Sequence, residues 1–486
     1  MKLMDIQSVL PAKRDLYYGG AWHKPSGGYV DVVNPSTGES LGPVAQADQE
    51  DVAKIIAAAR AGFEQWQGTL PKERSGVLRE IARIIRANAE ELALLDAANC
   101  GNPVTALLRD AENSASKLDY FAGVALEAKG STIPAGEDMM CMTVREPWGV
   151  CLRIGAFNHP ISFAGGRIGA PLATGNSVIL KPSPQAPLSA LRIAELIEGI
   201  APPGVINFVT CGLEATQSFV ADPKVDMVSI VGSINTGRAV AKACADRLKP
   251  MICELSGKNA LIAYPDADIA RTITGAVRGM NFTWCGQSCG STSRLFVHDS
   301  IHDQIAEGVI EASKRFKPGI ATDKATNMGA IISKPQFDKI MGYNELGKKQ
   351  GATLRLGGQR ASGAELANGY FIEPTVFTDV TPDMAIAHEE IFGPVLSIIR
   401  WSDEEEMLAH VNSVDYGLTA AIYTQDVSRA HRVARKVQSG FVWINDTSSH
   451  YLGAPFGGYK LSGVGREESI EELLAFTQIK TVKIAL

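Results

Sequence analysis

The sequence has no apolar run long enough to cross a bilayer and no run of like charges. A membrane-spanning helix needs about 18 consecutive apolar residues, and no stretch of this chain reaches that length. Residues 1–20 mix acids and bases without an apolar core, so we expect no signal peptide. The formal net charge of −6 argues against nucleic acid or an acidic membrane surface as the main partner.

Cysteine is scarce, with eight residues scattered over a chain of 486. This pattern fits reduced thiols and a cytoplasmic enzyme better than a disulfide framework. Cys285 and Cys289, in "NFTWCGQSCGS", are four residues apart and lack both the C-x-x-C spacing and a second pair nearby. We therefore expect no structural zinc and no other metal.

The chain also lacks the G-x-G-x-x-G pattern of many dinucleotide-binding proteins. After the expected strand "VDMVSIV" it has "GSINTG", Gly232 to Gly237, at the start of an expected helix. Unpaired N–H groups at such a turn favour a phosphate. The alternative is that Ser233 merely caps the helix between two turn-forming glycines.

What is present has ordinary globular composition and two long helical patterns near the start. In "DVAKIIAAARAGFEQWQ" apolar residues recur with helical spacing, with Asp48 as N-cap and Asp51 at the capping-box position. A second run extends from about Lys72 to Asn99, where Gly101 and Pro103 end it.

From Gly149 onward, short apolar runs alternate with helical segments. This alternation predicts an α/β fold with parallel sheets covered on both faces. The expected strands lie in "GVCLRIGAF", "NSVILKPS", "GVINFVT", "VDMVSIVGS", "SRLFVHD", "PVLSIIRW" and "FVWIND". Residues 126–147 suggest a protruding hairpin, and the terminal "TQIKTVKIAL" suggests a strand at a sheet edge.

Three polar residues follow expected strands, where ligands of such sheets bind. Lys181 could reach ribose hydroxyls or phosphate, or it could be a surface lysine. Glu254, before a glycine turn, suits either a general base or a structural acid. Asn158 could donate to an oxyanion or simply form a turn.

Taken together in order and spacing, these segments resemble the aldehyde dehydrogenase superfamily of NAD(P)-dependent, hydrolytic enzymes over nearly the whole chain. The resemblance is carried by "FNHP", "LATGNSVILKPS", "VGSINTG", "ELSGKN", "GQSC", "EEIFGPV" and "PFGGYKLSGVGRE". It implies that Cys289 attacks the aldehyde and that Asn158 and the Cys289 N–H hold the oxyanion. After hydride transfer to NAD or NADP, Glu254 would activate the water that hydrolyses the thioester.

The resemblance also implies a cofactor site and a domain plan. Cofactor contacts would come from Lys181 (adenosine ribose), Ser183, Gly232, Ser233 (pyrophosphate), Glu390 (nicotinamide ribose) and Phe392 (near the ring). The Rossmann-like NAD(P)-binding domain would comprise 1–126 and 146–255, the α/β catalytic domain 256–456, and a small β oligomerisation element 127–145 and 471–486. The element's strands would pair across subunits of a homodimer or homotetramer.

Two departures from the family pattern concern specificity. Pro184 stands where many NAD-preferring relatives have an acidic residue, so we expect use of both NAD and NADP. His159 and Gly166 replace larger aromatic residues of simple aliphatic-type relatives, which suggests a bulky or ring-bearing aldehyde. The expected substrate pocket consists of Phe157, His159, Phe163, Trp284, His450 and Phe456, although each histidine also suits a plain hydrogen-bonded role.

Other functions remain as alternatives. An aminoaldehyde, betaine-type or semialdehyde dehydrogenase would share the chemistry, whereas a cysteine hydrolase would pair Cys289 with His298 or His302. A coenzyme A-acylating relative typically lacks the glutamate that stands here at Glu254. Cys285 suits a buried packing residue, or else a protective disulfide partner of Cys289.

Overall fold

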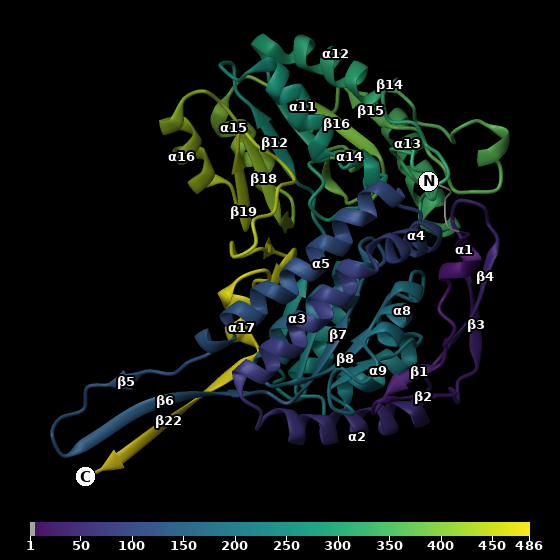
Figure 1. The fold of residues 1–486 in the computed structure, drawn as a ribbon. Coiled ribbons are helices and arrows are strands. Elements are labelled where there is room, and N and C mark those ends of the chain that lie inside the picture. Colours follow the sequence, from purple (N-terminus) through teal and green to yellow (C-terminus); the bar gives the residue numbers. More distant parts are fainter. Residues whose placement is uncertain (1–4) are drawn as a thin grey trace.

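The computed structural model describes residues 5–486. The first four residues, which belong to the expected first domain and to the segment expected to contain no signal peptide, lie outside this range. Two large sheets, each covered by helices, lie next to one another, and a narrow β arm extends from the first of them (Figure 1). No helix of the described residues has the length and hydrophobicity of a membrane span.

The first sheet has eight strands. Its five central strands run parallel, while β1, β2 and β21 are antiparallel edge strands. In sheet order these are β2 (Ala21–His23), β1 (Leu16–Tyr18), β9 (Ile206–Phe208), β8 (Ser177–Lys181), β7 (Val150–Ile154), β10 (Met227–Val231), β11 (Met251–Glu254) and β21 (Gly463–Val464).

Both faces of this sheet are buried, as a parallel sheet requires. Val150, Leu152 and Ile154 of β7 face one core, whose helices are α2 (Gln49–Trp66), α9 (Leu213–Ala221) and α10 (Ile234–Ala245). Cys151 faces the other core, which is covered by α3 (Pro71–Ala87), α5 (Val104–Val124), α6 (Pro160–Gly165), α7 (Gly169–Ala173), α8 (Leu188–Leu196) and α17 (Ile470–Ala475). The alternation expected from the sequence therefore forms a doubly covered sheet.

The second sheet has seven strands, all parallel except β14 at one edge. Its order is β14 (Thr353–Leu356), β15 (Thr375–Thr378), β16 (Val395–Trp401), β13 (Arg294–His298), β12 (Ala260–Ala263), β18 (Thr419–Tyr423) and β19 (Phe441–Ile444). One face packs on α11 (Ile269–Gly279) and α12 (His302–Ser313). The other packs on α13 (Lys334–Lys349), α14 (Ala385–His388), α15 (Glu404–Asn412) and α16 (Val427–Lys436).

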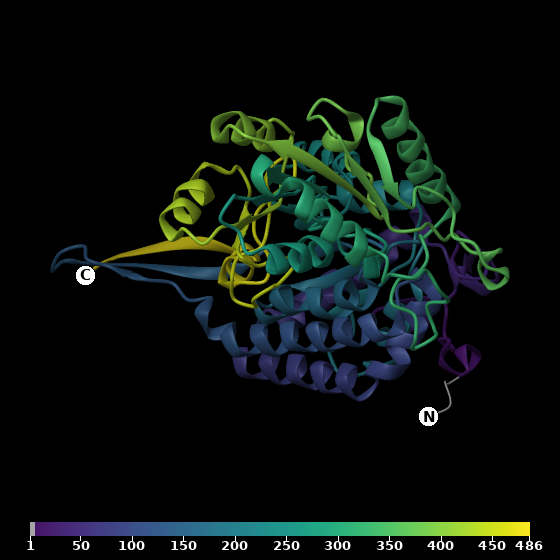
Figure 2. The same ribbon diagram turned by 90° about the horizontal axis from the view of Figure 1, so that it is seen from above.

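The expected hairpin and terminal strand are both present and form the arm, which stands clear of the body in both views (Figures 1 and 2). The arm consists of β5 (Thr132–Ile133), β6 (Met139–Pro147) and β22 (Thr477–Ala485). Within the chain, β22 pairs along its full length with β6. The expectation that strands of the arm pair across subunits stays a prediction. The chain end follows α17, which packs against α7. The Trp148 Nε1, just after β6, donates to the Ala475 carbonyl of α17 at 3.0 Å.

The early helical patterns are borne out at one position and wrong at another. Asp48 and Asp51 form the expected capping box at the start of α2. The single run expected over 72–99 is instead two helices, α3 and α4 (Ala89–Cys100), broken at Asn88. The Asn88 side chain donates to the carbonyl of Ile84 at 2.8 Å, a local hydrogen bond that competes with the helix. Gly101, with φ of 82°, ends α4 as expected.

The remaining elements are short. They are α1 (Ile6–Val9), β3 (Tyr29–Val33), β4 (Ser40–Ala45), β17 (Tyr416–Gly417), β20 (Tyr459–Lys460) and the 3-10 turns Ala125–Glu127, Gly166–Ile168, Phe282–Trp284, Asp299–Ile301 and Ala364–Leu366.

Candidate active site

Three loops from distant parts of the sequence meet where the two sheets adjoin. The Gly257 N–H donates to Oε1 of Glu390 at 2.9 Å. A Cβ on Gly257 would lie 2.4 Å from the Cys289 carbonyl oxygen, and one on Gly286 would lie 2.1 Å from that of Gly393. Only glycine allows these approaches, so the glycines of "ELSGKN", "GQSC" and "EEIFGPV" let the three loops pack against one another.

Side-chain hydrogen bonds and unusual backbone angles fix the cysteine loop. Asn259 Nδ2 donates to the carbonyls of Cys289 at 2.7 Å and of Ser291 at 3.0 Å. Asn281 and Cys285, at φ of 55° and 53°, have left-handed conformations that non-glycine residues rarely adopt. Such conformations persist where the surrounding contacts over-determine them, and they concentrate at functional sites.

Cys289 and Glu254 form the central pair. The Cys289 thiol donates to Oε1 of Glu254 across 3.0 Å. Burial and the negative charge of Glu467 raise the pKa of Glu254. Burial and the neighbouring Glu254 carboxylate raise the pKa of the Cys289 thiol. The pair therefore holds a protonated nucleophile directly against a carboxylate of increased basicity.

Asn158 lies just beyond β7 and is 3% exposed. Asn102 Nδ2 donates to its backbone carbonyl at 2.8 Å, which fixes the chain at this point. The Asn158 Oδ1 is buried without a hydrogen-bond partner within residues 5–486. In the same described range, the Cys289 N–H donates to no backbone carbonyl. A developing oxyanion needs hydrogen-bond donors, so the groups suited to hold it are the Nδ2 of the Asn158 amide and the Cys289 N–H.

The residues expected at the pyrophosphate and the adenosine ribose follow β8 and β10. Lys181 ends β8, is 7% exposed and has no ion pair in the described part of the chain, and burial lowers its pKa. Ser183 is also buried and accepts from the Gln185 N–H at 3.3 Å. A buried ammonium without a carboxylate partner fits hydroxyls or phosphate oxygens of a ligand better than it fits a structural role.

At the turn before α10, Ser233 accepts from the Thr236 N–H at 3.2 Å while remaining exposed. The capping interpretation therefore holds, and the side chain stays accessible. The expectation of free N–H groups fails at Gly232, whose N–H donates to the Glu254 carbonyl at 3.1 Å. That hydrogen bond ties the turn to the residue that carries the carboxylate.

Glu390 and Phe392 approach the same region from the second sheet. Besides accepting from Gly257, Glu390 has a pKa raised by burial. Phe392 has φ of 55° and packs edge-on against Phe157, with ring centroids 5.7 Å apart. Phe157 was expected in the substrate pocket, but its ring lies against Phe392 and is not part of the cavity wall.

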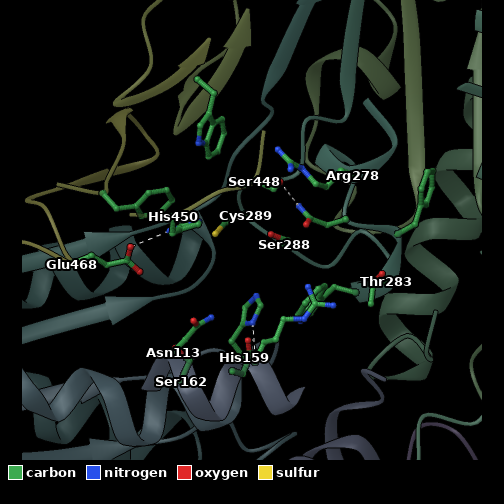
Figure 3. Close-up of a pocket in the computed structure, with 18 of the residues that line it drawn as sticks. Asn113, His159, Ser162, Arg278, Thr283, Ser288, Cys289, Ser448, His450 and Glu468 are labelled. Carbon is green, nitrogen blue, oxygen red and sulfur yellow. Dashed lines mark hydrogen bonds and ion pairs between the residues drawn. The ribbon is translucent and has the colours of Figure 1, made fainter. Parts of the chain in front are cut away.

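A cavity of about 790 Å³ opens onto Cys289 and Glu254. Its wall includes His159, Phe163, Trp284, His450 and Phe456, which are the other expected substrate-contacting residues. In Figure 3, His450 and His159 lie on different sides of Cys289, and Asn113 and Ser162 lie on the side of His159.

One wall of this cavity, a polar stripe on α5, was not expected from the sequence. Arg109, Asn113, Ser116 and Lys117 line the cavity at positions i, i+4, i+7 and i+8 of the helix. Their helical spacing in the sequence was a visible pattern. Its meaning depends on packing against residues more than 150 positions later, which no local pattern reveals.

A buried ion-pair network lies next to the site. Arg153 of β7 pairs with Glu467 at 3.2 Å and Glu472 at 3.1 Å, and Arg167 also pairs with Glu467. Glu467 lines the cavity, so the network connects the first sheet, the C-terminal segment and the electrostatic environment of Glu254.

Cys285 belongs to the core rather than to the site. It is 1% exposed, its thiol donates to the Gly329 carbonyl at 3.1 Å, and burial raises its pKa to about 12. Cys285 and Cys289 are both free thiols. Over the described residues no group of three or more His, Cys, Asp or Glu side chains is arranged to hold a metal ion.

Comparison with known proteins gives matches over almost the full chain. Residues 22–482 match the family described as "Aldehyde dehydrogenase family". The chain is 48% identical to "Aldehyde dehydrogenase tropH" of Talaromyces stipitatus, over 99% of this chain and 95% of that one. The NAD+ complex of an aldehyde dehydrogenase from Bacillus cereus superposes with a TM-score of 0.96 at 36% identity, covering 100% and 99% of the two chains. An indole-3-acetaldehyde dehydrogenase of P. syringae, a mutant in complex with NAD+ and IAA, gives 0.96 at 33% identity, covering 99% and 98%.

Proposed function

The chain belongs to the aldehyde dehydrogenase family, and we propose that this NAD(P)-dependent enzyme converts its aldehyde to a carboxylic acid through a thioester on Cys289. The contact between the Cys289 thiol and Glu254, inside a cavity large enough for a substrate, is the observation that carries this proposal. The α/β fold is that of the family, with TM-scores of 0.95–0.96 to solved members.

The reaction begins with removal of the thiol proton. Glu254 accepts it across the 3.0 Å contact, and the Cys289 thiolate forms a C–S bond to the aldehyde carbon. Asn158 and the Cys289 N–H donate to the carbonyl oxygen as it gains negative charge. The tetrahedral carbon then loses its hydrogen as hydride and becomes the acyl carbon of a thioester.

Hydrolysis reuses the same carboxylate. After its first proton has passed to solvent, Glu254 accepts a proton from water as the water oxygen attacks the acyl carbon. The C–S bond breaks, Cys289 leaves as thiolate, and the acid is released. The raised pKa of Glu254 suits it to accept these protons near neutral pH.

When bound, NAD(P)+ supplies the hydride acceptor. The chain offers it a buried, unpaired cation at Lys181, with Ser183 close by in sequence, and an exposed helix cap at Ser233 beside Gly232. Glu390 and Phe392, on the loop hydrogen-bonded to Gly257, would hold the nicotinamide half. These charged, polar and aromatic groups are of the types that bind the cofactor's hydroxyls, phosphates and ring.

We infer that both NAD+ and NADP+ are used. Pro184 is exposed three residues after Lys181 and provides neither an acceptor for the ribose diol nor a charge that repels a 2′-phosphate. Comparable kcat/KM for the two cofactors is the expected result, and a large preference for NAD+ would contradict it.

The family resemblance extends to assembly and domains. We propose a cytoplasmic homodimer or homotetramer, assembled through residues 127–145 and 471–486. The cofactor domain would comprise 1–126 and 146–255, and the catalytic domain 256–456. Several apolar side chains of the arm are exposed in the single chain, among them Ile133, Met140 and Ile479, and they would be buried by such assembly. Truncation of β22 followed by light scattering tests this.

The substrate is proposed to be a bulky or aromatic aldehyde. His159, Phe163, Trp284 and Phe456 surround a cavity of about 790 Å³, far larger than acetaldehyde requires. The test is a spectrophotometric panel of aliphatic, amino, carboxylated and aromatic aldehydes, each with NAD+ and NADP+, with identification of the acid product. Rapid turnover of acetaldehyde with poor turnover of benzaldehydes would contradict the proposal.

The hydrolase alternative makes a different prediction for the same panel. A cysteine hydrolase would cleave esters without reducing any cofactor. His298 bonds to Ser300 and His302 to Asp303, and neither histidine lines the cavity. Among residues 5–486 the Cys289 thiol is hydrogen-bonded to the Glu254 carboxylate and to no histidine, which supports Glu254 as its base.

A further inference from the structure

Two histidines line the cavity, and each is bound to a carboxylate through the same ring nitrogen. His159 Nδ1 lies 2.8 Å from Asp110 Oδ2, and His450 Nδ1 lies 3.0 Å from Glu468 Oε2. An ionised carboxylate only accepts hydrogen bonds, so Nδ1 carries the proton in both rings. Neither Nε2 has a hydrogen-bond partner among residues 5–486, and the two rings lie on different sides of Cys289 (Figure 3).

The surroundings of His450 favour its protonated form. Burial alone would lower the pKa of His450, but the Glu468 carboxylate outweighs this and raises it. Lys117 shares that carboxylate, with its Nζ 2.7 Å from Glu468 Oε1, and opposes the shift; the more distant Glu254 supports it. A protonated His450 presents an Nε2–H donor and a positive charge to the cavity.

The other charged groups of the wall are mostly paired. The acids of the wall are already engaged: Asp110 with His159, Glu254 with Cys289, Glu467 with Arg153 and Arg167, Glu468 with Lys117 and His450. Arg278 pairs with Asp446. Arg109 and Arg315 are exposed on the wall and have no ion-pair partner within residues 5–486.

Flat rings surround the two histidines. The His159 ring lies 5.4 Å from that of Trp284 and 6.0 Å from that of Phe163. The His450 ring lies 4.5 Å from that of Phe456. Such walls favour a planar ligand, and the histidine edges between them offer polar contacts at its rim.

From these contacts we propose that the substrate is an aromatic aldehyde bearing an acidic oxygen substituent, which His450 binds through its Nε2. Arg109 and Arg315 attract the same negative charge. The substituent is a carboxylate or an ionised ring hydroxyl, and the inference rests on the proposed oxidation at Cys289. Positively charged aldehydes of the amino or betaine type are disfavoured by the same groups.

The first test compares four benzaldehydes that differ in one para substituent. These are para-formylbenzoate, para-hydroxybenzaldehyde, the neutral methyl ester of the first, and para-(trimethylammonio)benzaldehyde. We expect kcat/KM for the carboxylate, the ionised hydroxyl or both to exceed that of the ester by about tenfold or more, with the cation lowest. The first two compounds distinguish a carboxylate from a hydroxyl as the recognised group.

The outcomes separate the two proposals. If the ester or the cation is oxidised as efficiently as both acidic compounds, the inference about the substituent is wrong and the dehydrogenase mechanism stands. If no aldehyde of the panel reduces either cofactor, the proposed function itself fails.

The second test changes the wall. His450→Gln and Arg315→Gln should each lower the ratio of kcat/KM for the acidic aldehyde over the ester by about tenfold. His431→Gln and Arg435→Gln, at exposed positions of α16, are matched controls that should leave the ratio unchanged. A ratio that stays constant in both wall variants would overturn the proposal.

A binding measurement avoids dependence on turnover. Benzene-1,4-dicarboxylate, the product of the carboxylated aldehyde, should inhibit the parent enzyme more strongly than benzoate does. Arg315→Gln should reduce this difference in inhibition constant, whereas Arg435→Gln should not. Equal inhibition by the two acids in the parent enzyme would count against a site for the second anionic group.

Discussion

Two parts of the cavity wall are built differently. At the reacting end, the Cys289 carbonyl is held by Asn259, and Gly257 and Gly286 let whole backbones approach each other. The other part of the wall is formed by side chains of α5 and of the C-terminal segment, among them Lys117 and His450. The comparison indicates that chemistry depends on close packing of loops, whereas selectivity depends on exchangeable side chains.

The largest effect on activity is expected for the nucleophile, Cys289. Cys289→Ala should reduce cofactor reduction by about 10⁴-fold or more, because no other group can form the thioester. Cys285→Ala, four residues away in the core, should cost ~1 kcal/mol of unfolding free energy and leave turnover in place. Assays of cofactor reduction and thermal unfolding of both variants check this. Equal activity of the two variants would contradict the assignment of Cys289 as nucleophile.

Next in size is the loss of the oxyanion donor. Asn158→Ala should lower kcat by about 10²–10³-fold, since the amide stabilises charge that appears only in the transition state. KM should change little. A variant with a raised KM and an unaltered kcat would instead indicate a substrate-binding role, and near-ultraviolet circular dichroism controls for loss of packing.

The pH profile tests the electrostatics of the reacting end. Burial and Glu467 raise the pKa of Glu254, and the carboxyl must be ionised to accept a proton. Activity should therefore be present above that raised pKa and fall about tenfold per unit as pH drops below it. Glu254→Gln should lack this limb in steady-state hydrolysis. If the activity of the parent enzyme instead fell only at the ordinary pKa of a glutamate, the pKa of Glu254 would not be raised.

The smallest effect is expected for the wall formed by α5 and the C-terminal segment. Glu468→Gln removes the carboxylate that favours protonated His450, so the preference for the acidic aldehyde over its ester should fall by about threefold to tenfold. Glu471→Gln, at an exposed position of α17, is the matched control. If Glu468→Gln instead lost kcat as severely as Asn158→Ala, the two parts of the wall would not divide chemistry from selectivity.

Much of the fold was predictable because its patterns are local. The strands around Lys181 and Glu254 were expected from apolar runs, and the capping box of α2 from two aspartates. Asn88 was missed because a single side-chain hydrogen bond divides a continuous periodic run. The direction of Phe157 was wrong for a similar reason, since its contact with Phe392 joins residues more than 200 positions apart.

The candidate site residues come from the family resemblance, which assigns them position by position, and their roles stay predictions. What the sequence could not provide is the wall that α5 contributes, or the shared pairing of His159 and His450 with carboxylates. Both depend on tertiary contacts between segments that no local pattern connects.

The most direct test of the central claim is a rapid-mixing experiment on Glu254→Gln. Without the carboxylate charge, which raises the pKa of the Cys289 thiol, the thiol still loses its proton to solvent, so acylation continues while hydrolysis lacks its base. We predict a burst of reduced cofactor close to the enzyme concentration, a slow steady state, and an acyl adduct on Cys289 by mass spectrometry. A variant that kept the parent steady-state rate, with no adduct, would contradict the assigned role of Glu254.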